Sequence, residues 1–444
     1  MASLKDKFRI SNFQIILLGF AGVILAGALL LMLPFASKAG RITSFPDTLF
    51  TATSAVCVTG LVVLDTGSYW SIWGKLLIIL LIQIGGLGVV TMAVSMTMFS
   101  GRRIDLMQRS IMQESISAAQ LGGIVRLTAF ILKVTAAVEL GGALLMSPVF
   151  IRDYGIIRGI GFSLFHSISC FCNAGFDLLG TNENKFVSMT GYASDPLINI
   201  VLILLILIGG IGFLTWDDFY KHKFRFIRYR LQTKVVLVTT LLLVVFPTIY
   251  FFVGEYYDLP LKDRILASLF QSVTTRTAGF NTTDNAALSE TGKMVTIILM
   301  LIGGSSGSTA GGIKMTTVAV MLATGVSVFK NKSSTNIFGR SIPEEITRKA
   351  AAIFTMYIML FLVASMVISR VENVPMITSM YEAGSAIATV GLTLGITPKL
   401  SLLSRGILIF LMFFGRVGGL TVIYAAFRKR KEVARFPHEE LAVG

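Results

Sequence analysis

Four short segments of this chain resemble one another, and they constrain its fold more than any other feature. Each places a small or polar pair before a glycine and a large apolar residue after it, and the four glycines stand 115, 104 and 112 residues apart. The segments are Val58-Thr59-Gly60-Leu61, Asn173-Ala174-Gly175-Phe176, Thr277-Ala278-Gly279-Phe280 and Thr389-Val390-Gly391-Leu392. Because similarity at a regular spacing indicates an internal repeat, we expect four units of about 110 residues built on one plan.

Composition places these units in a membrane. Hydrophobic residues make up 54% of the 444 residues and charged residues only 14%, and several apolar runs exceed the roughly 18 residues that indicate a transmembrane helix. The first run, from about Phe13 to Pro34, is long enough to span and is interpreted as a retained helix rather than a signal peptide. The net charge of +15 comes from Lys and Arg between the runs. That placement indicates topology and affinity for anionic lipid headgroups rather than nucleic-acid binding.

Each unit contains two long apolar runs with a shorter apolar segment between them. The shorter segment cannot cross a bilayer of about 30 Å, and irregular backbone at membrane depth is tolerated only inside protein or beside a water-filled cavity. We therefore expect a re-entrant half-helix that enters and leaves on one side. The expected half-helices are 48–58, 160–172, 263–275 and 375–388; the expected crossings are 13–34, 72–99, 125–150, 196–214, 235–253, 294–328, 351–368 and 405–426.

The chain is thus predicted to be an all-α integral membrane protein of four tandem repeats, each an outer helix, a pore loop and an inner helix. The expected repeats are 1–109, 110–230, 231–345 with an intramembrane loop at 303–314, and 346–444 with a cytoplasmic C-terminal tail. Lys and Arg gather in the links after the inner helices, so the positive-inside rule places those links and both termini in the cytoplasm. Two crossings per repeat give all four the same orientation. We expect eight transmembrane helices around one pore, with pseudo-fourfold symmetry.

The four glycines suit a filter for a monovalent cation. Backbone carbonyls can replace the hydration oxygens of such an ion without adding a full charge. Glycine leaves the axis unobstructed and reaches the positive φ that turns successive carbonyls inward. The half-helix before each glycine also directs the negative end of its dipole toward the axis. Any one of these glycines alone reads as a packing or turn residue, whereas four in equivalent loops indicate a filter.

Two further segments complete a resemblance to a known family: Gly303 to Lys314, which reads GGSSGSTAGGIK, and Gly415-Arg416-Val417-Gly418-Gly419. Over nearly its whole length the chain resembles the Ktr/Trk/HKT superfamily of potassium translocation proteins, and most of all the KtrB-type membrane subunit. The resemblance implies that carbonyls of the four loops bind potassium. The implied filter residues are Val58, Thr59, Gly60, Asn173, Ala174, Gly175, Thr277, Ala278, Gly279, Thr389, Val390 and Gly391.

The segment from Gly303 to Gly312 consists of Gly, Ser, Thr and Ala in the middle of an apolar run. Interior glycines cost a helix about 1 kcal/mol each relative to alanine, so we expect the helix to break here. Close packing of small residues between helices is the alternative. The resemblance implies a flexible loop that obstructs the pore below the filter and gates conduction. The predicted gate residues are Gly303, Gly304, Ser305, Ser306, Gly307, Ser308, Thr309, Ala310, Gly311, Gly312, Lys314 and Arg416.

Four charged residues within predicted membrane segments call for partners, because a charge in a span is costly and usually faces a partner or a cavity. Arg416 is predicted to contact carbonyls of the intramembrane loop and to add an electrostatic barrier; pairing with a carboxylate is the alternative. Glu139 remains open between an interhelical hydrogen bond and a place in the ion path. Arg276 and Glu382 are assigned to half-helices and are predicted to pair as a brace between neighbouring loops.

Nothing in the sequence indicates an enzyme. The three histidines are scattered, and no Ser/His/Asp grouping or metal-ligand cluster accompanies them. His166 is interpreted as a packing residue. Cys57, Cys170 and Cys172 lack metal-ligand spacing and are interpreted in the same way.

The predicted function is potassium uptake across the cell membrane, as the ion-translocating subunit of a Ktr-type system. A sodium-dependent mode and a channel-like mode both remain open, with potassium as substrate, sodium as a candidate activator and no cofactor in this chain. The alternative is a secondary carrier for another small solute, although carriers commonly use inverted repeats. The resemblance implies a homodimer seated on a cytosolic ring of nucleotide-binding, KtrA-like regulatory subunits. The basic links and the tail from Arg428 to Arg435 are the candidate docking surfaces.

Overall fold

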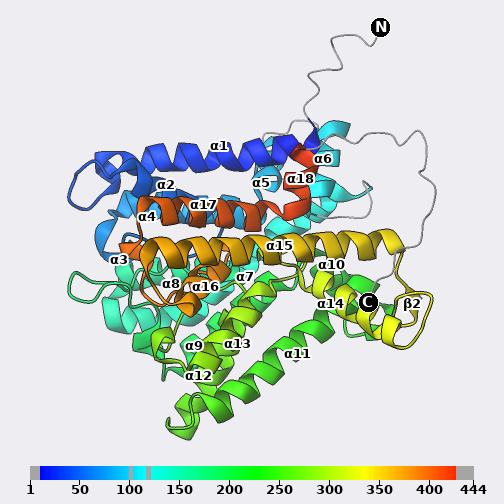
Figure 1. The fold of residues 1–444 in the computed structure, drawn as a ribbon. Coiled ribbons are helices and arrows are strands. Elements are labelled where there is room, and N and C mark those ends of the chain that lie inside the picture. The colour runs from blue at the N-terminus through cyan, green and yellow to red at the C-terminus, as the bar shows by residue number, and fades with distance from the viewer. Residues whose placement is uncertain (1–10, 100–103, 117–121, 427–444) are drawn as a thin grey trace.

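The computed structural model describes residues 11–99, 104–116 and 122–426. Helices form nearly all of the regular structure in these residues. A β-hairpin with two residues in each strand lies between the third repeat and the fourth (Figure 1). Arg102, Arg103, the basic tail at 428–435 and both chain ends, which entered the topology prediction, lie outside the described residues.

Each repeat contains an outer helix, a half-helix and an inner segment made of two helices. The outer helices are α1 (Asn12–Met32), α7 (Ile124–Tyr154), α11 (Leu231–Gly254) and α15 (Glu344–Glu372). The half-helices are α2 (Phe45–Val56), α8 (Ile156–Phe171), α12 (Leu261–Thr274) and α16 (Met376–Ile387). The inner segments are α4 (Ile72–Leu87) with α5 (Val89–Phe99), α9 (Pro196–Gly210) with α10 (Phe213–His222), α13 (Glu290–Leu301) with α14 (Met315–Phe329), and α17 (Leu402–Val417) with α18 (Gly419–Ala426). Besides short 3-10 turns, the other elements are α3 (Thr66–Tyr69), α6 (Leu106–Ile116), β1 (Asn336–Ile337) and β2 (Arg340–Ser341).

The outer helices form where apolar runs have clear ends. All four are long and apolar enough to cross a membrane. The first begins with a capping box, in which the Gln14 peptide N–H donates to Ser11 Oγ and the Ser11 N–H donates to Gln14 Oε1, at 3.2 and 2.9 Å. Counting each bent inner pair as one span gives up to seven crossings in the described residues. The eighth predicted crossing corresponds to α13 and α14, which a loop separates.

Three inner helices bend sharply, which corrects the prediction that 72–99, 196–214 and 405–426 are continuous crossings. The two helices of each pair meet at 96°, 96° and 94°. Each bend falls at a glycine with positive φ: Gly88 at 90°, Gly212 at 92° and Gly418 at 89°. Residues with a Cβ rarely adopt such a backbone, so glycine allows the chain to turn there. The second helix of each pair therefore runs across the end of the first.

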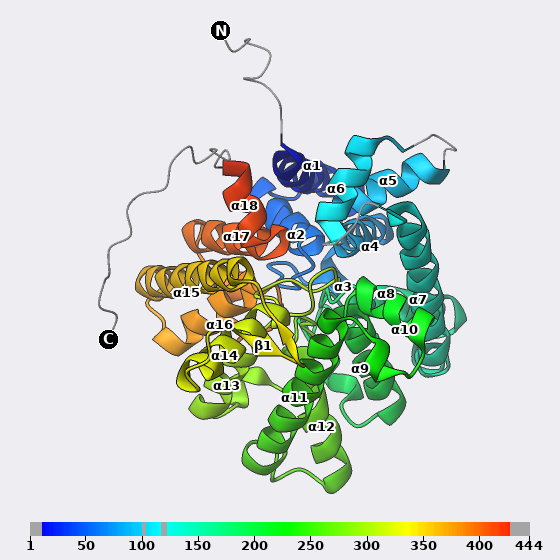
Figure 2. The ribbon, with the colours of Figure 1, turned by 90° about the vertical axis from the view of Figure 1, so that its right-hand side faces the viewer.

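The four repeats follow one another around a common centre. Viewed along this axis, the chain passes from blue through green to red, and the last repeat returns beside the first (Figure 2). Each inner helix packs against the half-helix of the next repeat: α4 on α8, α9 on α12, α13 on α16 and α17 on α2. An ion pair of 2.7 Å between Arg405 and Asp47 joins the fourth repeat to the first. The predicted pseudo-fourfold architecture is confirmed.

Candidate ion pathway

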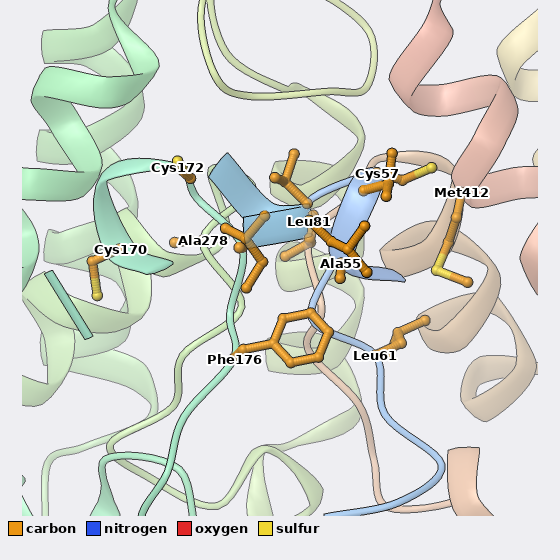
Figure 3. Close-up of a cluster of buried hydrophobic side chains, with 14 of the residues drawn as sticks. Ala55, Cys57, Leu61, Leu81, Cys170, Cys172, Phe176, Ala278 and Met412 are labelled. Atoms are coloured by element: carbon orange, nitrogen blue, oxygen red, sulfur yellow. The ribbon is translucent and has the colours of Figure 1, made fainter. Parts of the chain in front are cut away.

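The four predicted filter loops meet at the centre of the molecule and share one backbone conformation. The residue two positions before each glycine has a φ between 49° and 69°, and each glycine has a φ between 69° and 97°. Residues in the left-handed region thus alternate along each loop with residues outside it. This alternation turns successive peptide groups toward the same side. Figure 3 shows the loops surrounded by buried apolar side chains, among them Leu61, Phe176 and Met412. The loops are therefore rigidly supported.

The glycines form a closed ring in which each repeat faces the next. In each repeat, the residue just before the filter glycine has a carbonyl oxygen close to the glycine of the preceding repeat. A Cβ added to any of the four glycines would lie no more than 3.0 Å from that oxygen. The pairs are Gly60 with Ala174, Gly175 with Ala278, Gly279 with Val390 and Gly391 with Thr59. No side chain fits at these positions, and four backbone carbonyls, one from each repeat, lie around the axis.

A hydroxyl in the last turns of each half-helix holds the loop that follows. The Gly60 N–H donates to Ser54 Oγ at 3.1 Å, and the Gly391 N–H donates to Ser385 Oγ at 2.9 Å. In the second repeat Ser169 Oγ accepts from the Phe176 N–H at 3.1 Å, and in the third Thr274 Oγ1 donates to the Phe280 carbonyl. Sequence reasoning missed these residues, although a Ser or Thr five or six positions before each glycine was a visible signal.

The third loop closes differently from the other three. In repeats one, two and four, the N–H of the residue before the glycine donates to a carbonyl five residues earlier, each at 2.8 Å. In repeat three the Ala278 N–H donates to the Thr274 carbonyl, four residues earlier, at 3.0 Å. The stretch from the hydroxyl residue to the glycine is one residue shorter there. The third repeat thus departs from the common plan at the filter itself.

Glycines on the inner helices allow those helices to touch the half-helices behind the filter. A Cβ on Gly85, Gly209 or Gly415 would overlap the carbonyl oxygen of the last residue of the half-helix in its own repeat. The equivalent Gly303 instead faces the carbonyl of Gly311, within the intramembrane loop. In the third repeat this loop therefore stands where the other repeats have direct contact between helices.

The intramembrane loop runs from Ile302 to Lys314, and the predicted break in this helix is confirmed. Its ends are tied together by a hydrogen bond of 2.8 Å from the Gly303 N–H to the Ile313 carbonyl. The loop also binds the bend of the second repeat. The Ser305 N–H donates to the Gly210 carbonyl at 3.0 Å, and the Phe213 N–H donates to the Gly307 carbonyl at 2.7 Å.

The same loop touches two filter loops. Thr309 Oγ1 donates to the Phe171 carbonyl and accepts from Asn173 Nδ2, both at 3.1 Å. On the other side, a Cβ on Gly311 would overlap the side chain of Thr389. The loop therefore lies immediately behind the ring, in contact with repeats two and four.

Arg416 occupies the place that the second glycine of a Gly-Gly pair takes in the other repeats, at Gly86, Gly210 and Gly304. Its guanidinium donates to the carbonyls of Thr309, Gly85 and Gly86, the last at 2.9 Å. The predicted contact with the loop is thus present, and among the described residues Arg416 makes no ion pair with a carboxylate. A second cation, Lys314, donates to the Ala310 carbonyl at 2.6 Å. Two positive side chains hold the loop in place.

The filter and the loop lie between two cavities. One, of about 100 Å³, is lined by all four filter glycines together with Asp65 and Asp177. The other, of about 260 Å³, is lined by the loop, by Lys314 and Arg416, and by residues of the bends in repeats one and four. An ion that moved from one cavity to the other along this route would pass the ring and then the loop.

Glu139 makes the interhelical hydrogen bond that was one of its two predicted roles. Its carboxylate in α7 accepts from Gln83 Nε2 in α4 at 3.2 Å, across the boundary between repeats one and two. The Cys172 thiol, at the end of the second half-helix, approaches Gln83 Oε1 to 3.4 Å. Glu139, Gln83 and Cys172 therefore form a polar cluster behind the second filter loop.

The predicted pair of Arg276 and Glu382 is not formed in the described structure. Arg276 follows the end of α12 rather than lying on it, and its Nη2 donates to Thr240 Oγ1 of its own outer helix at 3.2 Å. Glu382 accepts from Thr397 Oγ1 at 2.7 Å and from the Leu394 N–H at 3.1 Å. Each residue braces its own repeat, because each finds polar partners there.

His166 packs in the core, as predicted for it. Its ring stacks on Phe150 with centroids 5.2 Å apart, and Nδ1 lies 2.7 Å from the Phe162 carbonyl. Nε2 accepts from the Leu178 N–H at 3.2 Å, which places the ring proton on Nδ1. His166 thereby holds the segment that follows the second filter loop. The three cysteines are free and buried.

Comparison with known proteins agrees with this architecture. Residues 5–434 match the TrkH family, described as cation transport protein. The chain is 38% identical over 448 residues to the potassium/sodium uptake protein NtpJ of Enterococcus hirae, with 98% of each chain covered. It is also 38% identical over 450 residues to the Ktr system potassium uptake protein B of Bacillus subtilis, with 99% of each covered.

A solved structure shows the same fold. The crystal structure of the potassium transporter TrkH from Vibrio parahaemolyticus aligns with a TM-score of 0.74 and 19% identity, over 96% of this chain and 87% of that one. The family match spans all four filter loops and both segments of the intramembrane gate region. The chain is therefore a multi-pass membrane protein that belongs to the TrkH family of cation transport proteins.

Proposed function

We propose that this chain takes up potassium across the cell membrane as the ion-translocating subunit of a Ktr-type system. The closed ring of backbone carbonyls around the four glycines carries this proposal. Carbonyl rings can replace the hydration shell of a potassium ion, and the four half-helices direct the negative ends of their dipoles toward the same point. The names of the relatives from Enterococcus hirae and Bacillus subtilis, both potassium uptake proteins, support the choice of ion.

In this proposal the twelve filter residues have two roles. The glycines leave the axis free of side chains, and the carbonyls of the glycines and of the two residues before each supply the oxygen ligands. The hydroxyls of Ser54, Ser169, Thr274 and Ser385 keep those carbonyls in place. A ring held by backbone and buried hydroxyls costs little reorganisation when an ion enters.

Residues 303–314 act as the gate in this proposal, together with Arg416. The guanidinium sits against the loop where an ion would leave the filter, and its positive charge repels a cation at that point. Opening requires Arg416 to release the Thr309 carbonyl and the loop to leave Gly209 and Gly210. Because Arg416 belongs to repeat four and the loop to repeat three, a relative movement of these two repeats would open the path.

The partners and orientation follow from the family. We place both termini and the basic links in the cytoplasm, and we expect a homodimer on a ring of KtrA-like, nucleotide-binding subunits. The Bacillus subtilis relative is named as protein B of a Ktr system, and this name supports the need for a further subunit. The name of the Enterococcus hirae relative includes sodium, so sodium stays a candidate activator or second substrate.

The test is complementation of a bacterium that lacks potassium uptake, grown at limiting potassium, with rubidium uptake measured in parallel. The wild type with a cytosolic partner should restore growth. Gly391→Ser should reduce rubidium affinity or admit sodium, because its side chain would overlap the Thr59 carbonyl. Gly406→Ser, on an inner helix with open space around it, is the matched control and should transport normally. A wild-type chain that reaches the membrane but moves neither ion would refute the proposal.

A further inference from the structure

A groove between the first two repeats stands outside the ion pathway. It lies between α4 and α8, has a volume of about 820 Å³, and is reached from the outer surface of the molecule. We call it the α4–α8 groove. Its volume is within the range of about 300 to 1,000 Å³ that is typical of sites for small ligands.

The floor of the α4–α8 groove is apolar. Leu76 and Ile79 line it from α4, and Leu164 and Ile168 line it from α8. Leu76 and Leu164 are 52% and 39% exposed. Because α8 is a half-helix, it covers only part of the membrane-facing side of α4. An apolar surface of this kind suits a hydrocarbon chain.

The rim of the groove is cationic. Lys38, Lys75 and Arg158 line the same cavity. Lys75 Nζ is anchored by a hydrogen bond of 2.6 Å to the Gly67 carbonyl, whereas Lys38 and Arg158 are exposed and make no ion pair in the described part of the chain. The carboxylate near Lys75 is Asp65, whose oxygens already accept from Ser68 and Phe186 at 2.6 to 2.8 Å. Asp65 is thus the one carboxylate beside Lys75, and Lys38 and Arg158 have no carboxylate partner in the described part of the chain.

Aromatic side chains mark this rim as the level of the membrane surface. Trp73, next to the groove on α4, is 64% exposed, and Tyr154, which lines the groove, is 38% exposed. Exposed Trp and Tyr gather where headgroups meet the hydrocarbon core. The three cations thus lie at headgroup depth, and the apolar floor lies below them.

We infer that the α4–α8 groove binds one anionic phospholipid, with its phosphate among Lys38, Lys75 and Arg158 and an acyl chain along the floor. A soluble anion would leave the apolar floor uncovered, and a neutral lipid would leave Lys38 and Arg158 without a counter-charge. Basic residues near a membrane surface contribute to binding of anionic lipids in this way. The site braces the boundary between repeats one and two, beside the segment that follows the second filter loop.

Native mass spectrometry of the full-length protein tests the cations. Protein in neutral detergent is incubated with equal amounts of phosphatidylglycerol and phosphatidylcholine, and the retained lipids are counted. The wild type should retain phosphatidylglycerol in preference. Lys38→Gln/Arg158→Gln should reduce this preference about fivefold for each residue changed. Lys262→Gln/Arg370→Gln, two exposed basic residues outside the groove, is the matched control and should bind like the wild type.

A second pair of variants tests the floor. Gly161 lines the groove on α8 and has open space at its Cβ position, so Gly161→Phe should fill the groove without disturbing the backbone and displace the lipid. Gly22→Phe, at an equally open position on α1, should leave binding unchanged. Unchanged phosphatidylglycerol retention in both groove variants would overturn the inference. The inference would also be overturned if the wild type showed no lipid preference and the groove variants lost a dimer that the wild type forms. A second copy of the chain would then be the occupant of the groove.

Discussion

The inner segments of the first, second and fourth repeats differ from that of the third, and the loop that we propose as the gate lies in the third. In three repeats one glycine turns the helix by 94° to 96°, and the helix before the turn packs directly on the end of its half-helix. In the third, residues 302–314 replace the bend and come between the helix and the filter. The ring is built from the features that the repeats share, and the candidate gate is built from the segment in which the third repeat differs.

The same contrast appears in the side chains. Three repeats carry a Gly-Gly pair at this position, on the inner helix in the first two and at the start of the loop in the third, and the fourth has Arg416 in place of the second glycine. That arginine reaches the loop of the third repeat and the carbonyls of the first. The two asymmetric features therefore meet at one place, immediately behind a ring that is otherwise nearly fourfold. Changes to symmetric positions should affect stability or ion affinity, and changes to asymmetric positions should affect gating.

The largest effect is expected where an inner helix touches a half-helix. Gly209→Ala should destabilise the protein by about 3 kcal/mol or more, because the new methyl group would overlap the Phe171 carbonyl in a packed core. Gly303→Ala makes the equivalent change in the third repeat, where the obstacle is the loop itself, and should be tolerated better. Thermal unfolding in detergent compares the two. Equal losses would show that the loop is as rigid as the helices.

Removing the charge at Arg416 should change transport more than stability. Arg416→Gln shortens the side chain and removes its charge-assisted hydrogen bonds to the Thr309 and Gly86 carbonyls. Rubidium uptake without a cytosolic partner should then rise about tenfold. Arg370→Gln, an exposed arginine on α15, is the control and should leave uptake unchanged. A fall in uptake with normal expression would argue that Arg416 supports the open state instead.

Replacing a bend glycine by alanine should destabilise the protein more than the same change in an ordinary helix, but less than the change at a packed glycine. Gly88→Ala should cost about 1 to 3 kcal/mol, because a residue with a Cβ is strained at a φ of 90°. Space is not the obstacle, since the nearest atom to the added Cβ is Ser115 Oγ at 3.4 Å. Gly22→Ala, in a regular helix, should be neutral or stabilising in the same unfolding assay. A neutral Gly88→Ala would mean that the bend is not set by its glycine.

The smallest effect is expected at the hydroxyls behind the filter. Ser385→Ala removes the acceptor for the Gly391 N–H and should cost about 1 kcal/mol, with a modest loss of rubidium affinity. Ser404→Ala removes a hydroxyl of the same kind from the start of α17, away from the filter, and should leave affinity unchanged. Equal affinities in the two variants would remove Ser385 from the support of the ring.

Several features of the site were predictable from local pattern, and others were not. The loops ending at Gly60 and Gly391, and the break at Gly303, follow from glycine placement within apolar runs. The right-angle bend at Gly88 was missed because a glycine inside a helical run allows a turn without requiring one. The pairing of Arg276 with Glu382 was wrong because charge alone does not specify a partner when hydroxyls and peptide groups lie closer. Aligning the Gly-Gly pairs across repeats would have shown that Arg416 stands in for a glycine.

The sequence by itself determined that this protein has four repeats, that it spans a membrane and that each repeat carries a glycine loop. These properties are local, because span length, re-entrant segments and glycine positions depend on neighbours along the chain. Only the tertiary structure decided that each glycine faces the carbonyl of the next repeat and that Arg416 reaches Gly85, 331 residues away. Such contacts depend on how four units close into a ring, and no pattern within one unit encodes that closure.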